Sequence, residues 1–273
     1  LPYDAMIREK RDKECPAGAQ SGFYPGGVYT YEKSFLAPEE WKNQDVVLEF
    51  EGIYGTARVW INGALATVNR NGYMGFSVDL KPWICYGQEN LIKIDVDNSN
   101  QPNSRWYTGS GIYRDVNLWT GKGVYIPHDE MKITTLSVND DVAVVEVCAN
   151  VKNTKECGIE AKCYVELIFE GKTVVTEKQN IVFYSGRKET VRVQIPVKCP
   201  KKWSTDHPNL YQCCVKTYIG DEICDEYTVD FGIRTLTLDP VNGFQINGET
   251  VNLRGTCIHH DNGVLGACCY PDA

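Results

Sequence analysis

The feature that most constrains the fold of this chain is a close succession of short strand-like runs, with turn residues between them. In the first half, these runs either alternate apolar and polar residues or are short and apolar throughout. They lie at 28–36, 46–50, 56–61, 64–68, 75–80, 91–97 and 112–119. So many strands in about 120 residues favour an antiparallel β-sandwich over any fold that needs long helices.

A second series of strand-like runs follows the glycines at Gly121 and Gly123. Its members lie at 131–138, 142–151, 160–169, 173–183, 188–195, 211–219 and 222–231. This number of strands in about 110 residues is typical of an immunoglobulin-like sandwich. The dipeptides Asn62-Gly63 and Asn247-Gly248 predict tight hairpin turns, because a type I′ turn needs positive φ at both central positions.

Composition narrows the function classes. The chain has 273 residues, enough for about two domains. It carries 36 acidic and 28 basic residues, a net charge of −8, so the phosphates of a nucleic acid would repel it. No apolar run approaches the roughly 18 residues of a membrane-spanning helix. We therefore expect neither a nucleic acid nor a membrane as a partner.

The twelve cysteines do not form the pattern of a disulfide framework or of a zinc site. Two adjacent pairs, Cys213-Cys214 and Cys268-Cys269, bond poorly within themselves because neighbouring strand residues face opposite ways. We expect most or all of the cysteines to be free thiols that act as small apolar side chains. Reduced thiols favour a cytoplasmic location, while a secreted or periplasmic one stays open.

A cation could be held by the closely spaced oxygens of Asp95, Asp97 and Asn98. Polar groups that alternate along a strand and into a turn give the same pattern, and this interpretation is favoured. We therefore expect no metal and no cofactor.

Five stretches of the sequence together carry a resemblance to a known family. They are 1–7, 23–27, 103–116, 231–234 and 252–266, and they occur in the family's order. The chain resembles glycoside hydrolase family 2, in its bacterial β-galactosidase branch, along its whole length. Its opening differs from the family pattern at Tyr3, where the family has histidine.

The resemblance implies three consecutive parts. Residues 1–122 would form a jelly-roll, galactose-binding-like β-sandwich, residues 123–237 an immunoglobulin-like β-sandwich, and residues 238–273 the start of a truncated TIM barrel. That start would hold the first barrel strand alone. Because such a strand would lack its neighbours, we expect residues 259–273 to be mobile, with no fixed place on this chain, or to be held by a contact with another molecule in a crystal.

Retaining glycosidases use two carboxyl groups about 5 to 5.5 Å apart, one as acid and base and one as nucleophile. The family motifs that carry these glutamates are not in this sequence. We therefore name no catalytic residue, and we expect the chain alone to be inactive.

The resemblance also indicates substrate-binding residues. Arg105 and Trp106 would reach from a long loop toward the sugar, and His259 aligns with a family histidine in the sugar pocket. His260 and Asp261 follow, at positions where the family's subgroups differ. Guanidinium groups donate paired hydrogen bonds to hydroxyls, and aromatic faces stack on pyranose rings. Each also has an ordinary interpretation: a solvated arginine, a tryptophan closing a sandwich, or a hydrogen-bonded polar group.

The sequence thus predicts the non-catalytic N-terminal region of a retaining β-galactosidase that hydrolyses terminal β-D-galactosides. The barrel decides which hydroxyl pattern is recognised, so β-glucuronidase and β-mannosidase remain alternatives. A stand-alone carbohydrate-binding module is a further alternative, because the fold alone permits it. A homo-oligomer is left open.

Overall fold

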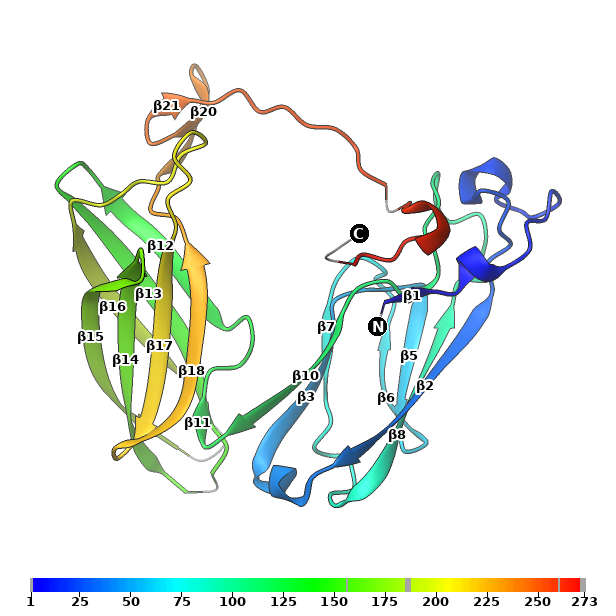
Figure 1. Ribbon diagram of the computed structural model, residues 1–273, viewed down its shortest axis with the longest axis horizontal. Helices are drawn as coiled ribbons and strands as arrows, with labels where there is room; N and C mark the ends of the chain where they lie inside the picture. Colours follow the sequence, from blue (N-terminus) through cyan, green and yellow to red (C-terminus); the bar gives the residue numbers. More distant parts are fainter. Residues whose placement is uncertain (1, 156, 185–187, 260, 271–273) are drawn as a thin grey trace. The chain divides into compact units, whose positions relative to one another are not determined.

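The computed structural model describes residues 2–155, 157–184, 188–259 and 261–270. The chain divides into two compact units (Figure 1). Residues up to Thr120, together with those from Thr256 onward, form the first domain, and Gly121–Gly255 form the second. Both are built from β-strands, and the first also has short 3-10 turns, which confirms the predicted all-β class. No helix in the described ranges is long and apolar enough to cross a membrane.

The first domain is an antiparallel sandwich. Its strands are β1 (Tyr3–Asp4), β2 (Val28–Ala37), β3 (Gln44–Phe50), β4 (Ile53–Tyr54), β5 (Thr56–Ile61), β6 (Ala64–Asn69), β7 (Phe76–Asp79), β8 (Gln88–Asp97), β9 (Gly111–Ile112) and β10 (Val116–Lys122). They form the sheets β2-β8-β5-β6, β10-β3-β7 and β1-β9-β4. The 3-10 turns are η1 (Met6–Arg8), η2 (Gly18–Ser21), η3 (Glu39–Asn43) and η4 (Gly263–Leu265).

The core of this sandwich follows from the alternation of side chains along its strands. In β5, Ala57, Val59 and Ile61 are buried, while the residues between them face outward. The strand then turns at Asn62-Gly63 with φ of 49° and 84°, and returns as β6. The predicted turn is therefore confirmed by its positive φ values.

The second domain is also a sandwich. Its strands are β11 (Val124–Tyr125), β12 (Met131–Val138), β13 (Val142–Asn153), β14 (Ile159–Phe169), β15 (Lys172–Phe183), β16 (Lys188–Lys198), β17 (Tyr211–Ile219), β18 (Glu222–Phe231), β19 (Leu236–Asp239), β20 (Gly243–Ile246) and β21 (Glu249–Thr250). One sheet pairs β13 with β11, β12 and β16, and the other has the order β15-β14-β17-β18. Strand β13 alternates strictly, and its inward residues from Ala143 to Val151 are fully buried.

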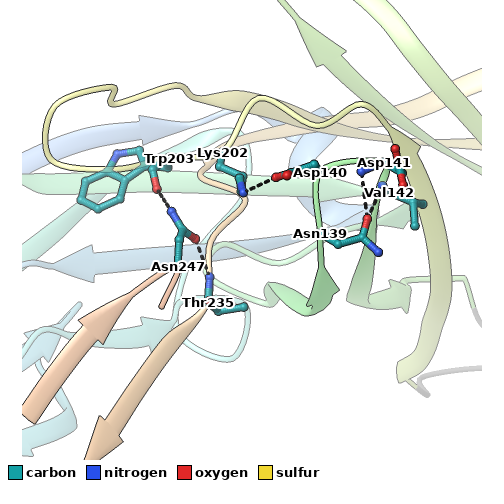
Figure 2. Close-up of polar contacts among 8 residues, drawn as sticks. All are labelled: Asn139, Asp140, Asp141, Val142, Lys202, Trp203, Thr235 and Asn247. Atoms are coloured by element: carbon teal, nitrogen blue, oxygen red, sulfur yellow. Dashed lines mark hydrogen bonds and ion pairs between the residues drawn. The ribbon is translucent and has the colours of Figure 1, made fainter. Parts of the chain in front are cut away.

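A small sheet, β19-β20-β21, lies at one end of the second domain and is tied to it by one side chain (Figure 2). The amide of Asn247 donates to the carbonyl of Trp203 at 2.9 Å and accepts from the backbone N–H of Thr235 at 3.1 Å. Beside this contact, Lys202 pairs with Asp140 at 2.8 Å. The bonds of Asn247 attach the small sheet to the second domain, whose compact unit extends to Gly255.

The predicted domain boundaries, at 122/123 and 237/238, stay predictions. Residues 238–255 lie with the second compact unit and residues 256–270 with the first. A compact unit in space need not coincide with a unit that folds alone. Residues 251–259 have no regular secondary structure.

Residues 261–270 pack on the first domain. The backbone N–H of Ala267 donates to the carboxylate of Asp4 at 2.9 Å, and that of Cys269 donates to the carbonyl of Tyr113 at 2.9 Å. The expectation that this end has no fixed place is therefore wrong for 261–270, because buried groups of the first domain offer it hydrogen bonds. His260 and residues 271–273 lie outside the described residues.

All twelve cysteines are free thiols, as the sequence predicts. Cys163 and Cys213 lie in the apolar core of the second domain. Burial raises the pKa of each of these two thiols to about 12, because a thiolate there would lose its hydration.

We expect native protein treated with iodoacetamide at pH 8 to react at the exposed Cys85 and Cys199 and to spare Cys163 and Cys213. The attacking species is the thiolate, so the buried pair should react more than about a hundredfold more slowly. Mass spectrometry of peptides from native and denatured samples measures this difference. Equal labelling of all four in native protein would contradict the assigned core.

Candidate functional site

The candidate site begins from a buried carboxylate, that of Asp4 at the end of β1, which is 2% exposed. One of its oxygens accepts the backbone N–H groups of Met6 at 2.9 Å and Ser110 at 3.0 Å. The other accepts the hydroxyl of Tyr107 at 2.6 Å and the N–H of Ala267 at 2.9 Å. Four donors offset the cost of burying this charge. Asp4 thus joins the N-terminal arm, the loop before β9 and the C-terminal segment.

Tyr107 is held firmly by this arrangement. Burial raises its pKa above the ordinary value of tyrosine, and the Asp4 carboxylate raises it further because it accepts the phenolic proton and would repel a phenolate. The Tyr107 ring also packs edge-to-face on the ring of Tyr24, with 5.8 Å between ring centres. The arm and the loop are therefore fixed to one another by both polar and aromatic contacts.

The loop that carries Arg105 and Trp106 is anchored by a second buried polar side chain, that of Asn98, which is 3% exposed. Its amide donates to the carbonyl of Gly109 at 3.1 Å and to the hydroxyl of Ser110 at 2.6 Å. Gly109 has a φ of +65°, and a Cβ there would lie 2.6 Å from the Asp4 carboxylate. Glycine is required at this position because the backbone passes so close to Asp4.

A cavity of about 690 Å³ opens beside this framework, within the first domain; we call it the arginine cavity. Its lining comes from three segments and comprises Ile7, Arg8, Arg11, Ala19, Gln20, Gly22, Tyr24, Arg105, Trp106, Tyr107, Asp261, Gly263 and Val264. The volume lies within the usual range of small-molecule sites. Arg105, Trp106 and Asp261 of the predicted site therefore line one cavity.

His259 lies next to this cavity and not in its lining. Its ring is 5.2 Å from the ring of Trp106, between centres, and is tilted by 38°. The indole N–H of Trp106 donates to the hydroxyl of Tyr73 at 3.2 Å, so the tryptophan is held from two sides. The structure thus brings together Arg105, Trp106, His259 and Asp261, and His260 lies outside the described residues.

The arginine cavity is basic although the chain as a whole is acidic. Arg8, Arg11 and Arg105 line it, against the single carboxylate of Asp261. No ion pair neutralises any of these three arginines within the described part of the chain. The guanidinium of Arg11 lies 5.4 Å from the centre of the Tyr24 ring, a cation–π contact that positions it. These groups suit a ligand that is rich in hydroxyls or carries an anionic group.

The sequence did not predict Arg8, Arg11 or Tyr24 as site residues. They belong to an arm broken by proline and glycine, where no periodicity shows which side chains face inward. The signal that could have found them is the short spacing of Arg8 and Arg11 after the opening stretch that contains Asp4.

The three residues considered above as possible cation ligands have other roles; they are Asp95, Asp97 and Asn98. Asp95 accepts the hydroxyl of Thr30 at 2.8 Å on the neighbouring strand. Asp97 accepts both the backbone N–H and the hydroxyl of Ser99, which lower its pKa. Asn98 anchors the loop described above.

Two family models match the chain, one for each sandwich. Residues 19–122 match the sugar binding domain of glycosyl hydrolases family 2, and residues 124–234 match a further domain model of glycosyl hydrolases family 2. These two matches, in this order along the chain, place it among the glycoside hydrolases. Within that class, it belongs to glycoside hydrolase family 2.

Similar proteins agree with this assignment. A β-galactosidase of Bacteroides ovatus, BoGH2A, is 35% identical over 268 residues, which is 98% of this chain and 32% of that protein. A putative β-glucuronidase of Formosa agariphila is 32% identical over 97% of this chain and 25% of its own length. A solved family 2 member from Bacteroides cellulosilyticus has a TM-score of 0.92 and 31% identity, over 99% of this chain and 36% of that one. The chain thus spans about a third of these proteins or less.

Proposed function

We propose that this chain is the non-catalytic N-terminal region of a retaining family 2 glycoside hydrolase, a β-galactosidase that acts on terminal β-D-galactosides. The observation that carries the proposal is the arginine cavity, where Arg105, Trp106 and Asp261 converge beside His259. Hydrogen-bonding guanidinium groups next to an exposed aromatic ring are the elements a sugar site needs. The B. ovatus relative, named a β-galactosidase, supports the choice of substrate.

In this role the chain binds and orients the sugar, and the two carboxyl groups of a retaining mechanism come from elsewhere in the longer protein. Asp261 alone among the lining residues carries a carboxylate, so the arginine cavity itself supplies no acid and nucleophile pair. Binding groups of this kind contribute to rate by holding the reacting bond in place.

A β-glucuronidase is the second candidate, and a specific observation favours it. Three arginines with one opposing carboxylate leave the arginine cavity with a surplus of positive charge. A uronic acid carboxylate could accept paired hydrogen bonds from a guanidinium group there. The F. agariphila relative carries that activity in its name.

A panel of nitrophenyl glycosides separates these candidates. We expect the longer protein to hydrolyse the β-galactoside faster than the β-glucuronide and the β-mannoside. A preference for the glucuronide would replace the proposed substrate, and hydrolysis of none of the three would favour a stand-alone carbohydrate-binding module.

Arg105→Ala is expected to reduce kcat/KM of the longer protein by roughly tenfold to a hundredfold, the effect of losing a hydrogen bond from a charged group of about 1.5 to 3 kcal/mol. The melting temperature should stay within about 1 °C of the unmodified protein, because Arg105 is exposed on a loop. Steady-state kinetics and calorimetry measure the two effects.

Arg192→Ala is the matched control, since Arg192 is an exposed arginine on β16 of the second domain. It should leave kcat/KM unchanged. If Arg105→Ala also left kcat/KM unchanged, Arg105 would be an ordinary solvated arginine.

A further inference from the structure

Five asparagines of the chain directly precede a glycine, the dipeptide in which asparagine is most prone to spontaneous deamidation. They are Asn62, Asn71, Asn242, Asn247 and Asn262. In this reaction the backbone nitrogen after the asparagine attacks the side-chain carbonyl carbon, and ammonia leaves as a cyclic imide forms. Glycine at the second position favours the attack, because it has no Cβ to obstruct the nitrogen. The fold then determines which of the five can react.

In four of these dipeptides, the side-chain amide that would leave as ammonia is held by a hydrogen bond. The acceptors are the carbonyl of Trp83 for Asn62 at 3.0 Å, the carboxylate of Asp239 for Asn242, the carbonyl of Trp203 for Asn247 at 2.9 Å and the carbonyl of Cys268 for Asn262 at 2.7 Å. Each amide must give up this bond before it can react, so the fold protects these four asparagines.

Asn71 differs from the other four asparagines. It is exposed, and its side-chain nitrogen donates no hydrogen bond among the described residues. The backbone N–H of Gly72, which would make the attack, has no acceptor within that same part of the chain. The leaving group and the attacking nitrogen are therefore both unoccupied.

The backbone N–H of Tyr73 is placed to assist the reaction. When the nitrogen of Gly72 attacks the side-chain carbon of Asn71, an electron pair of the C=O bond moves onto the side-chain oxygen. That oxygen already accepts the N–H of Tyr73 at 3.0 Å. A fixed donor at the atom where negative charge develops stabilises the transition state, as in an oxyanion hole.

The backbone on both sides of the reacting bond is held in place. The side chain of Asn69 accepts the N–H of Asn71 at 3.3 Å and donates to its carbonyl at 2.9 Å. The carbonyl of Gly72 accepts the hydroxyl of Tyr113 at 2.9 Å. A Cβ at Gly72 would lie 2.5 Å from the ring of Tyr54, so the loop requires glycine there. Holding two reacting groups next to one another raises the rate of an intramolecular step.

We propose that Asn71 is a self-modification site, which the folded first domain converts to isoaspartate and aspartate without an enzyme. The nitrogen of Gly72 gives its proton to hydroxide and bonds to Cγ of Asn71. The bond from Cγ to the side-chain nitrogen breaks, and that nitrogen takes a proton from water and leaves as ammonia. Water then opens the imide at the side-chain carbonyl to give aspartate, or at the main-chain carbonyl to give isoaspartate. Nothing is oxidised or reduced, and water is the only other reactant.

The modification changes both the charge and the backbone of this loop. Either product adds one negative charge to a chain whose net charge is −8. Isoaspartate also lengthens the main chain by one carbon, between the bonds that hold Asn71 and Gly72. Tyr73 follows directly, and its hydroxyl accepts the indole N–H of Trp106 at 3.2 Å. The modification therefore alters the loop that supports Trp106.

The test is incubation of the 273-residue chain at mildly alkaline pH, followed over time by peptide mass spectrometry, which detects the gain of about 1 Da. A parallel sample unfolded in guanidinium chloride gives the rate of each asparagine without the fold. We expect Asn71 to react in the folded chain at least as fast as in the unfolded one. The other four should each react at least about fivefold more slowly when folded, the factor expected from one hydrogen bond.

Asn71→Gln is the matched control, because its longer side chain would have to close a six-membered imide, which forms far more slowly. The peptide that holds residue 71 should then gain no mass, while the other four asparagines behave as in the unmodified chain. The proposal is overturned if the fold protects Asn71 as strongly as the other four, or if any of those four reacts faster than Asn71 in the folded chain. These readouts do not involve sugar binding or hydrolysis, so they are independent of the proposed function.

Discussion

Replacing Asp4 with alanine is expected to destabilise the first domain by about 4 kcal/mol, the largest effect on stability that we predict for one side chain. The change removes one carboxylate and leaves four buried donors without an acceptor: the N–H groups of Met6, Ser110 and Ala267 and the hydroxyl of Tyr107. The melting temperature of the first domain should fall by roughly 10 °C.

Asp4→Asn should have an intermediate effect, because an amide keeps one acceptor oxygen but turns an N–H group toward two of the donors. Asp12→Ala is the control, since Asp12 is exposed and its carboxylate accepts a single backbone N–H among the described residues, that of Glu14 at 2.9 Å. We expect it to cost less than about 1 kcal/mol. A melting temperature for Asp4→Ala that equals that of Asp12→Ala would show that the buried carboxylate does not hold the site together.

The parts of the fold that local rules govern could be predicted from the sequence. The alternation of β13 and the Asn-Gly turn after β5 each depend on residues within a few positions of one another. The same holds for the adjacent cysteine pairs, which are free thiols as expected for neighbouring residues that face opposite ways. These features require no knowledge of distant contacts.

The candidate site was only partly predictable, because its framework joins distant residues. The hydrogen bond from the N–H of Ala267 to the carboxylate of Asp4 joins residues 263 positions apart, and no local sequence pattern predicts it. Arg8 and Arg11 reach the arginine cavity from an irregular arm, where only the path of the backbone decides which side chains face inward. Arg105 and Trp106 were found because a resemblance singled out their loop.

The second large effect that we predict is a complete loss of catalysis in the isolated chain. Retaining cleavage requires an acid and a nucleophile held about 5 to 5.5 Å apart on rigid supports. In the proposed function Arg105, Trp106 and His259 bind the sugar, but binding groups without that carboxyl pair do not stabilise the charged transition state. Enzymes accelerate such reactions by many orders of magnitude over the uncatalysed rate, so the activities of the longer protein and of the isolated chain should differ by a large factor.

The most direct test of the account measures nitrophenyl β-galactoside hydrolysis by the 273-residue chain and by the longer protein, at equal molarity and beside a mock purification. The account predicts rapid release of nitrophenol by the longer protein and none above the mock level by the chain alone. Turnover by the chain itself would contradict it, because the catalytic machinery would then have to lie among the residues assigned here to sugar binding.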